Sequence, residues 1–208
     1  MGLLRRFFGN FEKPQGMMGK IVVAMMNKGH VGIAAWGFSH LTLRGDERVL
    51  DCGCGGGANV AKFLQLLPGG YVSGLDYSPV SVEKARDVNS AAIAAGRCTI
   101  LQGNVLKLPF EDGQFDVVTA FETVYFWAEI ARCFAEVCRV LKPGGVFMIT
   151  NETSGKTGAH EKWQKLVDGM SVYTGEDLEE LLTGVGFARV MIDEDLKTDR
   201  LNVRAYKA

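Results

Sequence analysis

The sequence lacks an excess of either charge. Its 208 residues carry 23 lysines and arginines against 24 aspartates and glutamates, which gives a formal net charge of −1. Proteins that bind nucleic acid generally present a basic field to the phosphate backbone. Nucleic acid is therefore not an expected partner of this protein.

Long apolar runs and a secretory signal are missing as well. No stretch approaches the roughly 18 apolar residues that a membrane-spanning helix needs, and Arg5 and Arg6 interrupt the apolar side chains of residues 1–11. A cleaved signal would place an unbroken apolar region there, and a myristoylation signal would have Ser or Thr at the sixth position. We expect a cytoplasmic protein with no integral membrane association, either a monomer or a homodimer.

Cysteine is too scarce for a disulfide framework, since the five cysteines are an odd number in a chain large enough to fold around a core. Cys52 and Cys54 flank a glycine, but two thiolates without a second pair of ligands make a poor metal site. Cys133 and Cys138 lie on one predicted helix at a spacing that points them in different directions. The sequence therefore predicts free thiols in a reducing compartment and no bound metal.

What the sequence does contain, from about residue 45, is an alternation of short apolar runs and helical segments. We expect a division there into an N-terminal helical lid or appendage, residues 1–44, and one α/β domain, residues 45–208. The expected strands are Arg48–Cys52, Tyr71–Asp76, Cys98–Gln102, Phe115–Phe121, Gly145–Asn151, Phe187–Asp193 and Leu201–Lys207. The expected helices are Met17–Asn27, Ala58–Leu67, Pro79–Ala95, Trp127–Val140 and Gly175–Val185.

The order of these segments predicts the kind of sheet. The first five strands are short apolar runs joined by helical crossovers, which is the pattern of a parallel sheet covered by helices on both faces. The last two strands are separated only by the polar stretch Glu194–Arg200, so they should pair as an antiparallel hairpin. Residues 152–174 form one long insertion, and loops of that length in a compact domain are usually functional.

The most informative motif is the glycine-dense turn that follows the first strand within Val49–Gly57. Gly53, Gly55 and Gly57 lack the Cβ atoms that would keep a ligand off the backbone, and they permit positive φ where a strand turns into a helix. Asp51 at the strand end would repel a pyrophosphate but attract a cationic ligand with an ammonium and a sulfonium. The turn therefore predicts a site for a nucleotide-like cofactor.

Polar side chains follow the next two strands at the same edge of the predicted sheet. Asp76 stands where two ribose hydroxyls could donate to one carboxylate, although it could instead cap the helix that begins near Pro79. Asn104 could accept from the exocyclic amine of adenine while the Val105 amide donates to a ring nitrogen. Alternatively, Asn104 is a turn residue that tolerates a left-handed conformation.

The fourth strand brings Phe121, Glu122, Thr123 and Tyr125 to this edge. Reacting groups in parallel sheets lie outside the carboxyl ends of the strands. Glu122 and Tyr125 are therefore the candidates for contact with the second substrate.

Taken in order, these residues resemble the class I S-adenosylmethionine-dependent methyltransferases over about residues 46–208. The glycine turn is similar to the family's glycine motif, Asp76 to its ribose-binding acid, and Asn104 to its adenine-reading position. Leu141–Gly145 is similar to the turn before its fifth strand. Asn104 departs from the Asp of many members, which keeps an acceptor atom but loses a charge.

The resemblance implies a Rossmann-like three-layer sandwich with a seven-stranded, mostly parallel sheet in the order 3-2-1-4-5-7-6, strand 7 being antiparallel. It implies S-adenosylmethionine as the cofactor, S-adenosylhomocysteine as its product, and methyl transfer to a small-molecule acceptor. Glu122 and Tyr125 are the catalytic candidates. The residues expected to bind the cofactor are Asp51, Gly53, Cys54, Gly55, Asp76, Tyr77, Asn104, Val105, Phe121 and Trp36, the last of these in an N-terminal segment that resembles a lid.

Two other classes of function stay open at this point. Gly53-x-Gly55-x-x-Ala58 also matches the dinucleotide fingerprint of NAD(P)-dependent oxidoreductases, and Asp76 follows about twenty residues on. Against that class stand Asp51, beside what would be a pyrophosphate, and the lack of a second catalytic domain. The third class is a non-catalytic module that only binds the cofactor, and the acidic and phenolic side chains at the reactive edge count against it.

Overall fold

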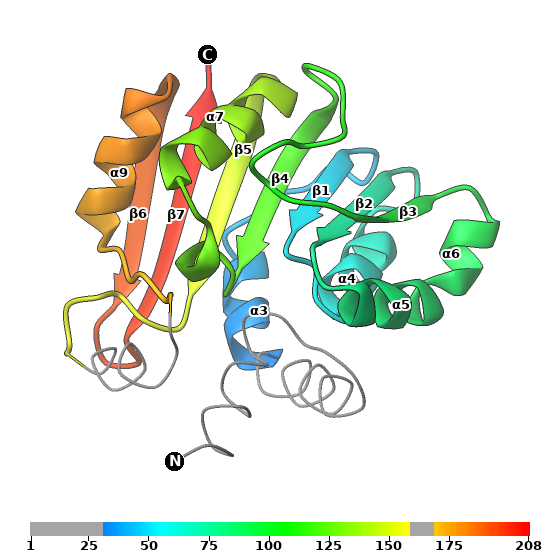
Figure 1. Cartoon of the computed structure of the whole chain (residues 1–208), viewed down its shortest axis with the longest axis horizontal. Helices are drawn as coiled ribbons and strands as arrows, with labels where there is room; N and C mark the ends of the chain where they lie inside the picture. The colour runs from blue at the N-terminus through cyan, green and yellow to red at the C-terminus, as the bar shows by residue number, and fades with distance from the viewer. Residues whose placement is uncertain (1–30, 159–168) are drawn as a thin grey trace.

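A seven-stranded sheet lies at the centre of the protein (Figure 1). The structure is a computed structural model that describes residues 31–158 and 169–208. The strands are β1 Arg48–Cys52, β2 Tyr71–Asp76, β3 Cys98–Gln102, β4 Phe115–Phe121, β5 Leu141–Asn151, β6 Phe187–Asp195 and β7 Arg200–Lys207.

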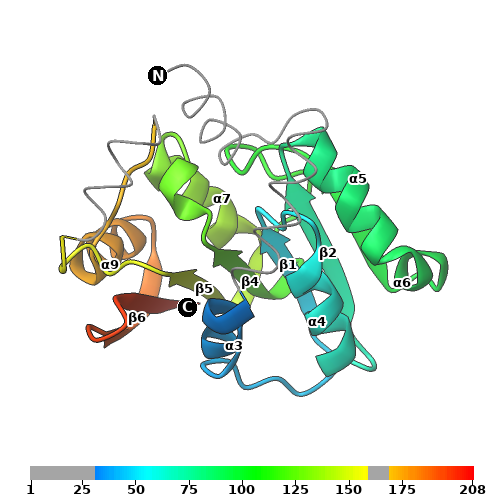
Figure 2. The ribbon, with the colours of Figure 1, turned by 90° about the horizontal axis from the view of Figure 1, so that it is seen from below.

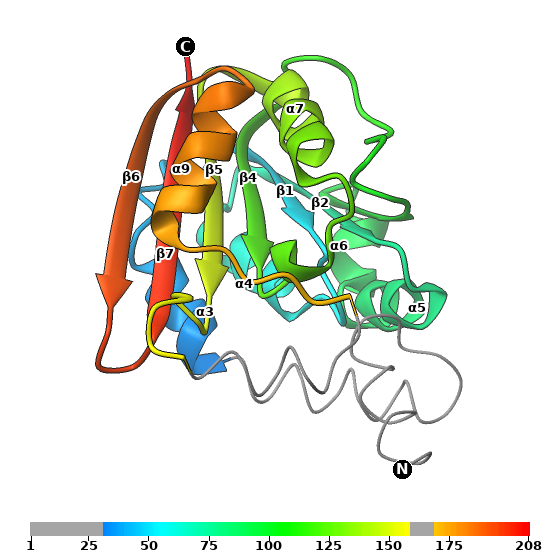
Figure 3. The ribbon, with the colours of Figure 1, turned by 60° about the vertical axis from the view of Figure 1, so that its left-hand side comes forward.

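The strand order is β3-β2-β1-β4-β5-β7-β6. Strands β1 to β5 pair parallel with one another, whereas β7 pairs antiparallel with both β5 and β6. This arrangement confirms the predicted fold class, the strand order and the C-terminal hairpin. It also brings the carboxyl ends of the parallel strands to one edge, as the arrowheads of β4 and β5 show in Figure 3.

Helices cover both faces of the sheet, so the molecule has three layers. Side chains of α3, α4 and α5 pack into one core, and those of α7 and α9 pack into a second core on the opposite face. Figure 2 shows α3 and α4 below the sheet and α7 and α9 above it. The helices are α3 Val31–Phe38, α4 Ala58–Leu66, α5 Pro79–Val88, α6 Ser90–Ala94, the 3-10 helix η1 Val124–Phe126, α7 Ile130–Val140 and α9 Gly175–Gly184.

Two of the predicted helices differ from the structure by more than one residue at an end. The expected helix Pro79–Ala95 is interrupted at Asn89, whose buried side-chain amide donates to the carbonyl oxygens of Gly57 at 3.1 Å and Ala85 at 2.9 Å. The helix expected from Trp127 begins at α7 instead, because Glu129 has a left-handed φ of 47°. Tertiary contacts and local backbone geometry determine both helix boundaries, so the helical periodicity of the sequence cannot predict where these helices begin or end.

The connection from β3 to β4 contains no helix, in agreement with the expected helices, but the general expectation that helical crossovers join all of the first five strands is wrong at this point. Within residues 103–114, Asn104 forms an isolated bridge with Lys107, and the Phe110 ring packs edge-on against Phe115 with 4.9 Å between centroids. The connection therefore runs as an irregular loop that carries its own apolar contacts.

Helix α3 docks directly onto the ends of β4 and β5. A Cβ atom on Gly37 would lie 2.6 Å from Cε1 of Phe121 and 2.7 Å from Oγ1 of Thr150, so only glycine allows this approach. The ring of Phe38 contacts those of Phe63 and Phe121, with centroids 4.7 and 5.3 Å away. Helix α3 was not predicted, and the predicted helix Met17–Asn27 lies outside the described residues.

Within residues 31–158 and 169–208, no helix is both long enough and apolar enough to cross a membrane.

Candidate active site

A cavity of about 650 Å³ opens at the carboxyl edge of β1 to β4. Its walls come from the glycine turn, the ends of β2 and β4, the loop after β3, and the helices α3 and α4. Most of the predicted site residues line this one cavity, namely Gly53, Cys54, Gly55, Asp76, Tyr77, Asn104, Val105, Phe121 and Glu122. Asp51, Tyr125 and Trp36 do not line it.

The glycine turn folds back on the neighbouring strands. The amides of Gly53 and Cys54 donate to the carbonyl oxygen of Leu75, at 2.7 and 3.0 Å. A Cβ atom on Gly53 would lie 2.2 Å from Oγ1 of Thr123, so the turn interlocks with the loop after β4. Gly55 has a φ of 52°, and a Cβ atom there would meet nothing within 4 Å. Its backbone therefore faces open space, where a ligand can approach closely.

Asp51 lies behind the turn and not in the cavity wall. It is buried, its Oδ1 accepts from Oγ1 of Thr119 at 2.8 Å, and its Oδ2 has no hydrogen-bond partner among the described residues. Burial raises the pKa of Asp51 to about 7, and the charge of Asp76 adds to that rise, whereas the Thr119 hydrogen bond opposes it. Direct contact between this carboxylate and a cationic ligand stays a prediction.

Asp76 links the end of β2 to the glycine turn. Its Oδ2 accepts from the Gly55 amide and its Oδ1 from the Ser78 amide, both at 2.9 Å. Burial raises the pKa of Asp76, and these hydrogen bonds counteract the rise. The helix cap is Ser78, whose Oγ accepts from the Ser81 amide. Asp76 is therefore not needed as a helix cap, and its oxygens keep lone pairs that can accept from a ligand in the cavity.

Asn104 and Val105 line the cavity on the side of β3. The Asn104 side-chain oxygen already accepts from the Leu106 amide at 2.9 Å, which is an Asx turn. Asn104 is therefore a turn residue, although it does not have the left-handed conformation expected for that role. The adenine contact stays a prediction, for which the side-chain oxygen keeps a second lone pair.

Glu122 stands at the end of β4 in a left-handed conformation, with a φ of 57°. Its Oε1 accepts from the Glu152 amide and lies 3.5 Å from the Tyr125 hydroxyl, which donates to it. Burial raises the pKa of Glu122 to about 8, and the charge of Glu152 adds to this, whereas the two hydrogen bonds act in the opposite direction. Such backbone strain costs about 1–3 kcal/mol and clusters at functional sites.

Tyr125 lies behind Glu122. It is 3 % exposed, and burial raises the pKa of its hydroxyl well above the ordinary value. The hydroxyl contacts the Glu122 carboxyl, so the predicted direct contact between Tyr125 and the acceptor has no support in this geometry.

Trp36 does not face the cavity either. Its ring packs edge-on against His40, with 4.6 Å between centroids. The residues of α3 that line the cavity are Val31, Ile33, Ala34, Ala35 and Phe38. Four of them, at 31, 34, 35 and 38, have the i, i+3, i+4, i+7 spacing of one helical face, which is the signal that could have found them.

Asn59 and Lys62 of α4 also line the cavity and were not predicted. Helix α4 begins directly after the glycine turn, so the first two turns of this helix necessarily border any ligand held there. Lys62 brings a positive charge to a wall that otherwise carries the carboxyl groups of Asp76 and Glu122.

Comparison with known proteins identifies the domain. Residues 50–149 match the family described as methyltransferase domain. Cycloartenol-C-24-methyltransferase 1 of Oryza sativa subsp. japonica is 33 % identical over 105 residues, which are 49 % of this chain and 29 % of the relative. O-methyltransferase resE of Aspergillus sclerotiorum is 26 % identical over 163 residues, which are 76 % of this chain and 61 % of the relative.

A solved structure shows the same fold. A SAM-dependent methyltransferase from Aquifex aeolicus superposes with a TM-score of 0.74 at 19 % sequence identity, covering 91 % of this chain and 98 % of that chain. The chain spans between about a quarter and about half of the length of the first curated relatives that it matches.

Proposed function

The chain carries a class I S-adenosylmethionine-dependent methyltransferase domain, and from this premise we propose that it transfers the methyl group of S-adenosylmethionine to an apolar small-molecule acceptor. The observation that carries the proposal is the single cavity that joins the glycine turn, Asp76, Asn104 and Glu122 at the carboxyl edge of the sheet.

The residues present fit this cofactor. The Gly55 backbone borders open space, so the cavity can accept a ligand against the turn. Asp76 offers the ribose hydroxyls a carboxylate, and Asn104 with the Val105 amide offers adenine an acceptor and a donor. Lys62 and the start of α4 suit the carboxylate of the methionine part. When bound, the cofactor supplies an electrophilic methyl group on a sulfonium.

The protein contributes positioning, exclusion of water and, for some acceptors, proton removal. Holding two reactants in line can supply about 7–11 kcal/mol of the barrier reduction. Gly55, Asp76 and Asn104 would hold the cofactor, which would supply its methyl carbon to the acceptor's electron pair and keep the electrons of the carbon–sulfur bond on sulfur. Where the acceptor is a hydroxyl or an ammonium, its proton goes to the Glu122 carboxylate.

The remaining wall of the cavity favours an uncharged, apolar acceptor. Side chains of α3 and of the segment after β4 supply mostly aliphatic and aromatic surface, with Val31, Ala35, Phe38, Phe126 and Trp127 among them. Lys62 is the one basic side chain in the described wall, so a phosphorylated acceptor would compete with the cofactor for it. Two similar relatives have names that describe a C-methyltransferase and an O-methyltransferase, and both reaction types stay open here.

Replacing Asp76 tests the cofactor site. We expect Asp76→Ala to weaken binding of S-adenosylmethionine by about 1.5–3 kcal/mol, the range for a hydrogen bond to a charged group, as measured by calorimetric titration. Asp87→Ala, on the exposed face of the following helix, is the matched control and should bind like the unchanged protein. Equal affinities of the two variants, both folded, would remove Asp76 from the site.

Activity is tested by radiolabel transfer from methyl-labelled S-adenosylmethionine to a panel of apolar phenols, amines and alkenes. The proposed role of Glu122 is supported if the unchanged protein methylates one of these compounds and the Glu122→Gln variant methylates it more slowly. Binding of NAD in preference to S-adenosylmethionine would contradict the proposal as a whole.

A further inference from the structure

The turn between β6 and β7 is hydrogen-bonded to the loop that follows β5. Asp199 in this turn has a left-handed φ of 56°. Its Oδ2 accepts from Oγ1 of Thr153 at 3.0 Å, and its Oδ1 accepts from the Ser154 amide at 3.2 Å and from the Ser154 hydroxyl at 2.6 Å. Thr153 and Ser154 are both buried. One carboxylate from a distant part of the chain thus fixes two successive residues of the loop.

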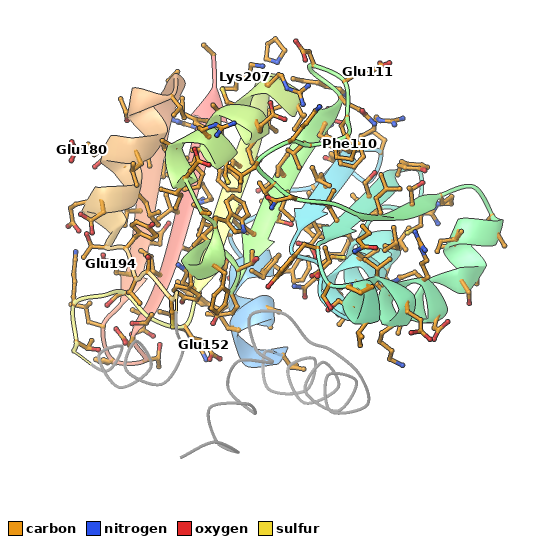
Figure 4. The ribbon with its side chains drawn as sticks, in the orientation of Figure 1. Phe110, Glu111, Glu152, Glu180, Glu194 and Lys207 are labelled. Atoms are coloured by element: carbon orange, nitrogen blue, oxygen red, sulfur yellow. The ribbon has the colours of Figure 1, made fainter. Side chains whose placement is uncertain are left out.

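The same loop supplies the hydrogen bond that holds Glu122. The residue directly before Thr153 is Glu152, and its amide donates to Oε1 of Glu122. Figure 4 shows Glu152 at the edge of the sheet where β5 ends. Asp199 is therefore connected to the Glu122 carboxyl through the hydrogen bond that it accepts from Thr153, the peptide unit between Thr153 and Glu152, and the hydrogen bond from the Glu152 amide.

The ion pairs that also anchor this loop are more exposed, whereas the Thr153 backbone makes a further hydrogen bond to the buried Tyr125 hydroxyl. Lys156 pairs with Glu176 at 2.7 Å and with Glu194 at 2.8 Å, and the Glu176 side chain is 64 % exposed. Exposed ion pairs contribute little because solvent and salt screen them. The Asp199 hydrogen bonds to buried partners are therefore a stronger restraint on the position of Glu152 than these ion pairs are.

We propose that Asp199 is a positioning residue for Glu122, holding the loop after β5 so that the Glu152 amide stays on the Glu122 carboxylate. The inference rests on the proposed function, which places Glu122 beside the methyl acceptor. Asp199 itself does not line the cavity. Its effect on the reaction passes through the orientation and the ionisation of Glu122.

The pKa of Glu122 can be used to test whether Asp199 holds the loop after β5 in place. A hydrogen bond donated to a carboxylate favours the charged form, so losing the Glu152 amide raises the pKa of Glu122 further. The titratable groups that face Glu122 are Tyr125 from η1 and Glu152 from the loop, and the side chains of α3 that line the cavity are all apolar. Removing the negative charge of Asp199 would by itself lower the pKa of nearby groups, so a rise cannot come from charge loss.

The test is a ¹³C NMR titration of the full chain with labelled glutamate side chains, in which Glu122→Gln assigns the Glu122 signal. We expect Asp199→Ala to raise the pKa of Glu122 by about one pH unit, the effect of one charge-assisted hydrogen bond. Thr153→Val removes one donor without changing any charge and should shift the pKa in the same direction. Asp195→Ala is the control, because Asp195 accepts only from Lys197 and Thr198 within the same turn among the described contacts.

An unchanged or lowered pKa of Glu122 in Asp199→Ala overturns the inference. If that variant does not fold, the pKa of Glu122 in Thr153→Val is measured instead, and an unchanged or lowered value there overturns the inference. The titration needs neither cofactor nor acceptor, so its outcome is independent of the proposed function. Failure of the unchanged protein to bind S-adenosylmethionine would refute the proposed function and leave the titration result standing. With an acceptor in hand, we expect Asp199→Ala to shift the pH dependence of kcat upward with a nearly unchanged affinity for the cofactor.

Discussion

Asp51 and Asp76 are both buried carboxyl groups at the edge of the sheet, but their surroundings differ. Asp76 accepts two backbone hydrogen bonds, whereas one oxygen of Asp51 has no partner among the described residues. Burial consequently dominates the behaviour of Asp51 and raises its pKa to about 7. The folded protein therefore binds a proton at Asp51 that the unfolded chain releases near the ordinary pKa.

This difference predicts how Asp51 affects stability. Between the unfolded and the folded pKa the folded state holds more protons, so the free energy of unfolding falls as pH rises, by at most about 1.4 kcal/mol per pH unit. We expect Asp51→Asn to be less sensitive to pH than the unchanged protein between pH 4 and pH 7, as measured by urea unfolding.

Asp116 provides a control of opposite sign. Hydrogen bonds from the Arg48 amide and from Lys142 lower its pKa against the effect of burial, so its contribution to stability is lost as pH falls. Asp116→Asn should therefore be less stable than the unchanged protein at pH 7 and approach it in acid. The same pH dependence in Asp51→Asn as in the unchanged protein would contradict the raised pKa of Asp51.

The predicted site residues that line the cavity include Asp76, Asn104 and Glu122. Each of these three ends or follows a strand whose apolar run is unambiguous, and the carboxyl ends of parallel strands meet at one edge. Trp36 lies within α3 and Tyr125 within η1, and in a helix a shift of one residue rotates a side chain by about 100°. The facing direction of such residues depends on tertiary contacts that the sequence does not report.

At the scale of elements, Gly37 sets how closely α3 approaches the sheet. A Cβ atom there would overlap Phe121 and Thr150, whereas one on Gly32 would have only Arg200 nearby, at an ordinary 3.6 Å. We expect Gly37→Ala to lower the free energy of unfolding by about 1–3 kcal/mol, the cost of overpacking. Gly32→Ala, in the same helix, should stabilise by up to about 1 kcal/mol because alanine favours helix. Thermal unfolding of both variants checks this, and equal shifts would contradict the close approach.

The docking of α3 also predicts its dynamics. Because Gly37 and Phe38 pack on β4, β5 and α4, we expect slow amide exchange in residues 33–38 both with and without cofactor. Hydrogen exchange followed by mass spectrometry measures this. Exchange that becomes slow in this segment only after addition of S-adenosylmethionine would instead show that α3 closes over the cofactor, as the lid hypothesis requires. The remainder of the predicted lid, residues 1–30, lies outside the described part of the chain.

The strands were more predictable than their connections. Strands β1 to β4 are short apolar runs between turn residues, and the polar stretch between the last two strands predicts their antiparallel pairing. The connection from β3 to β4 shows that a parallel arrangement does not require a helix between successive strands. Helix α3 contains two glycines and mostly small apolar residues, so the apolar face at residues 31, 34, 35 and 38 is not set apart by polar residues on the other side of the helix. The division of the expected helix at Asn89 depends on a hydrogen bond to Gly57, 32 residues away.

At the scale of the whole molecule, cofactor binding should stabilise the fold as a unit. A ligand at one hundred times its dissociation constant adds about 2.7 kcal/mol to the free energy of unfolding. For a chain of this length we expect S-adenosylmethionine to raise the Tm by about 5–10 °C. NAD at the same concentration is the control and should leave the Tm unchanged, since the oxidoreductase interpretation predicts the opposite order. Asp76→Ala should reduce the shift.

The position of β7 has a consequence for how the protein is made. β7 lies between β5 and β6, although it follows both in the sequence. A nascent chain that ends before residue 200 consequently holds β5 and β6 without the strand that joins them, and each then exposes an unpaired edge that can pair with another chain. Pairing of residues 200–207 with β5 and β6 closes this gap, and Asp199, directly before β7, accepts from the Ser154 amide in the loop after β5. A chain that ends before residue 199 therefore lacks both the strand that joins β5 to β6 and the carboxylate that accepts from this loop.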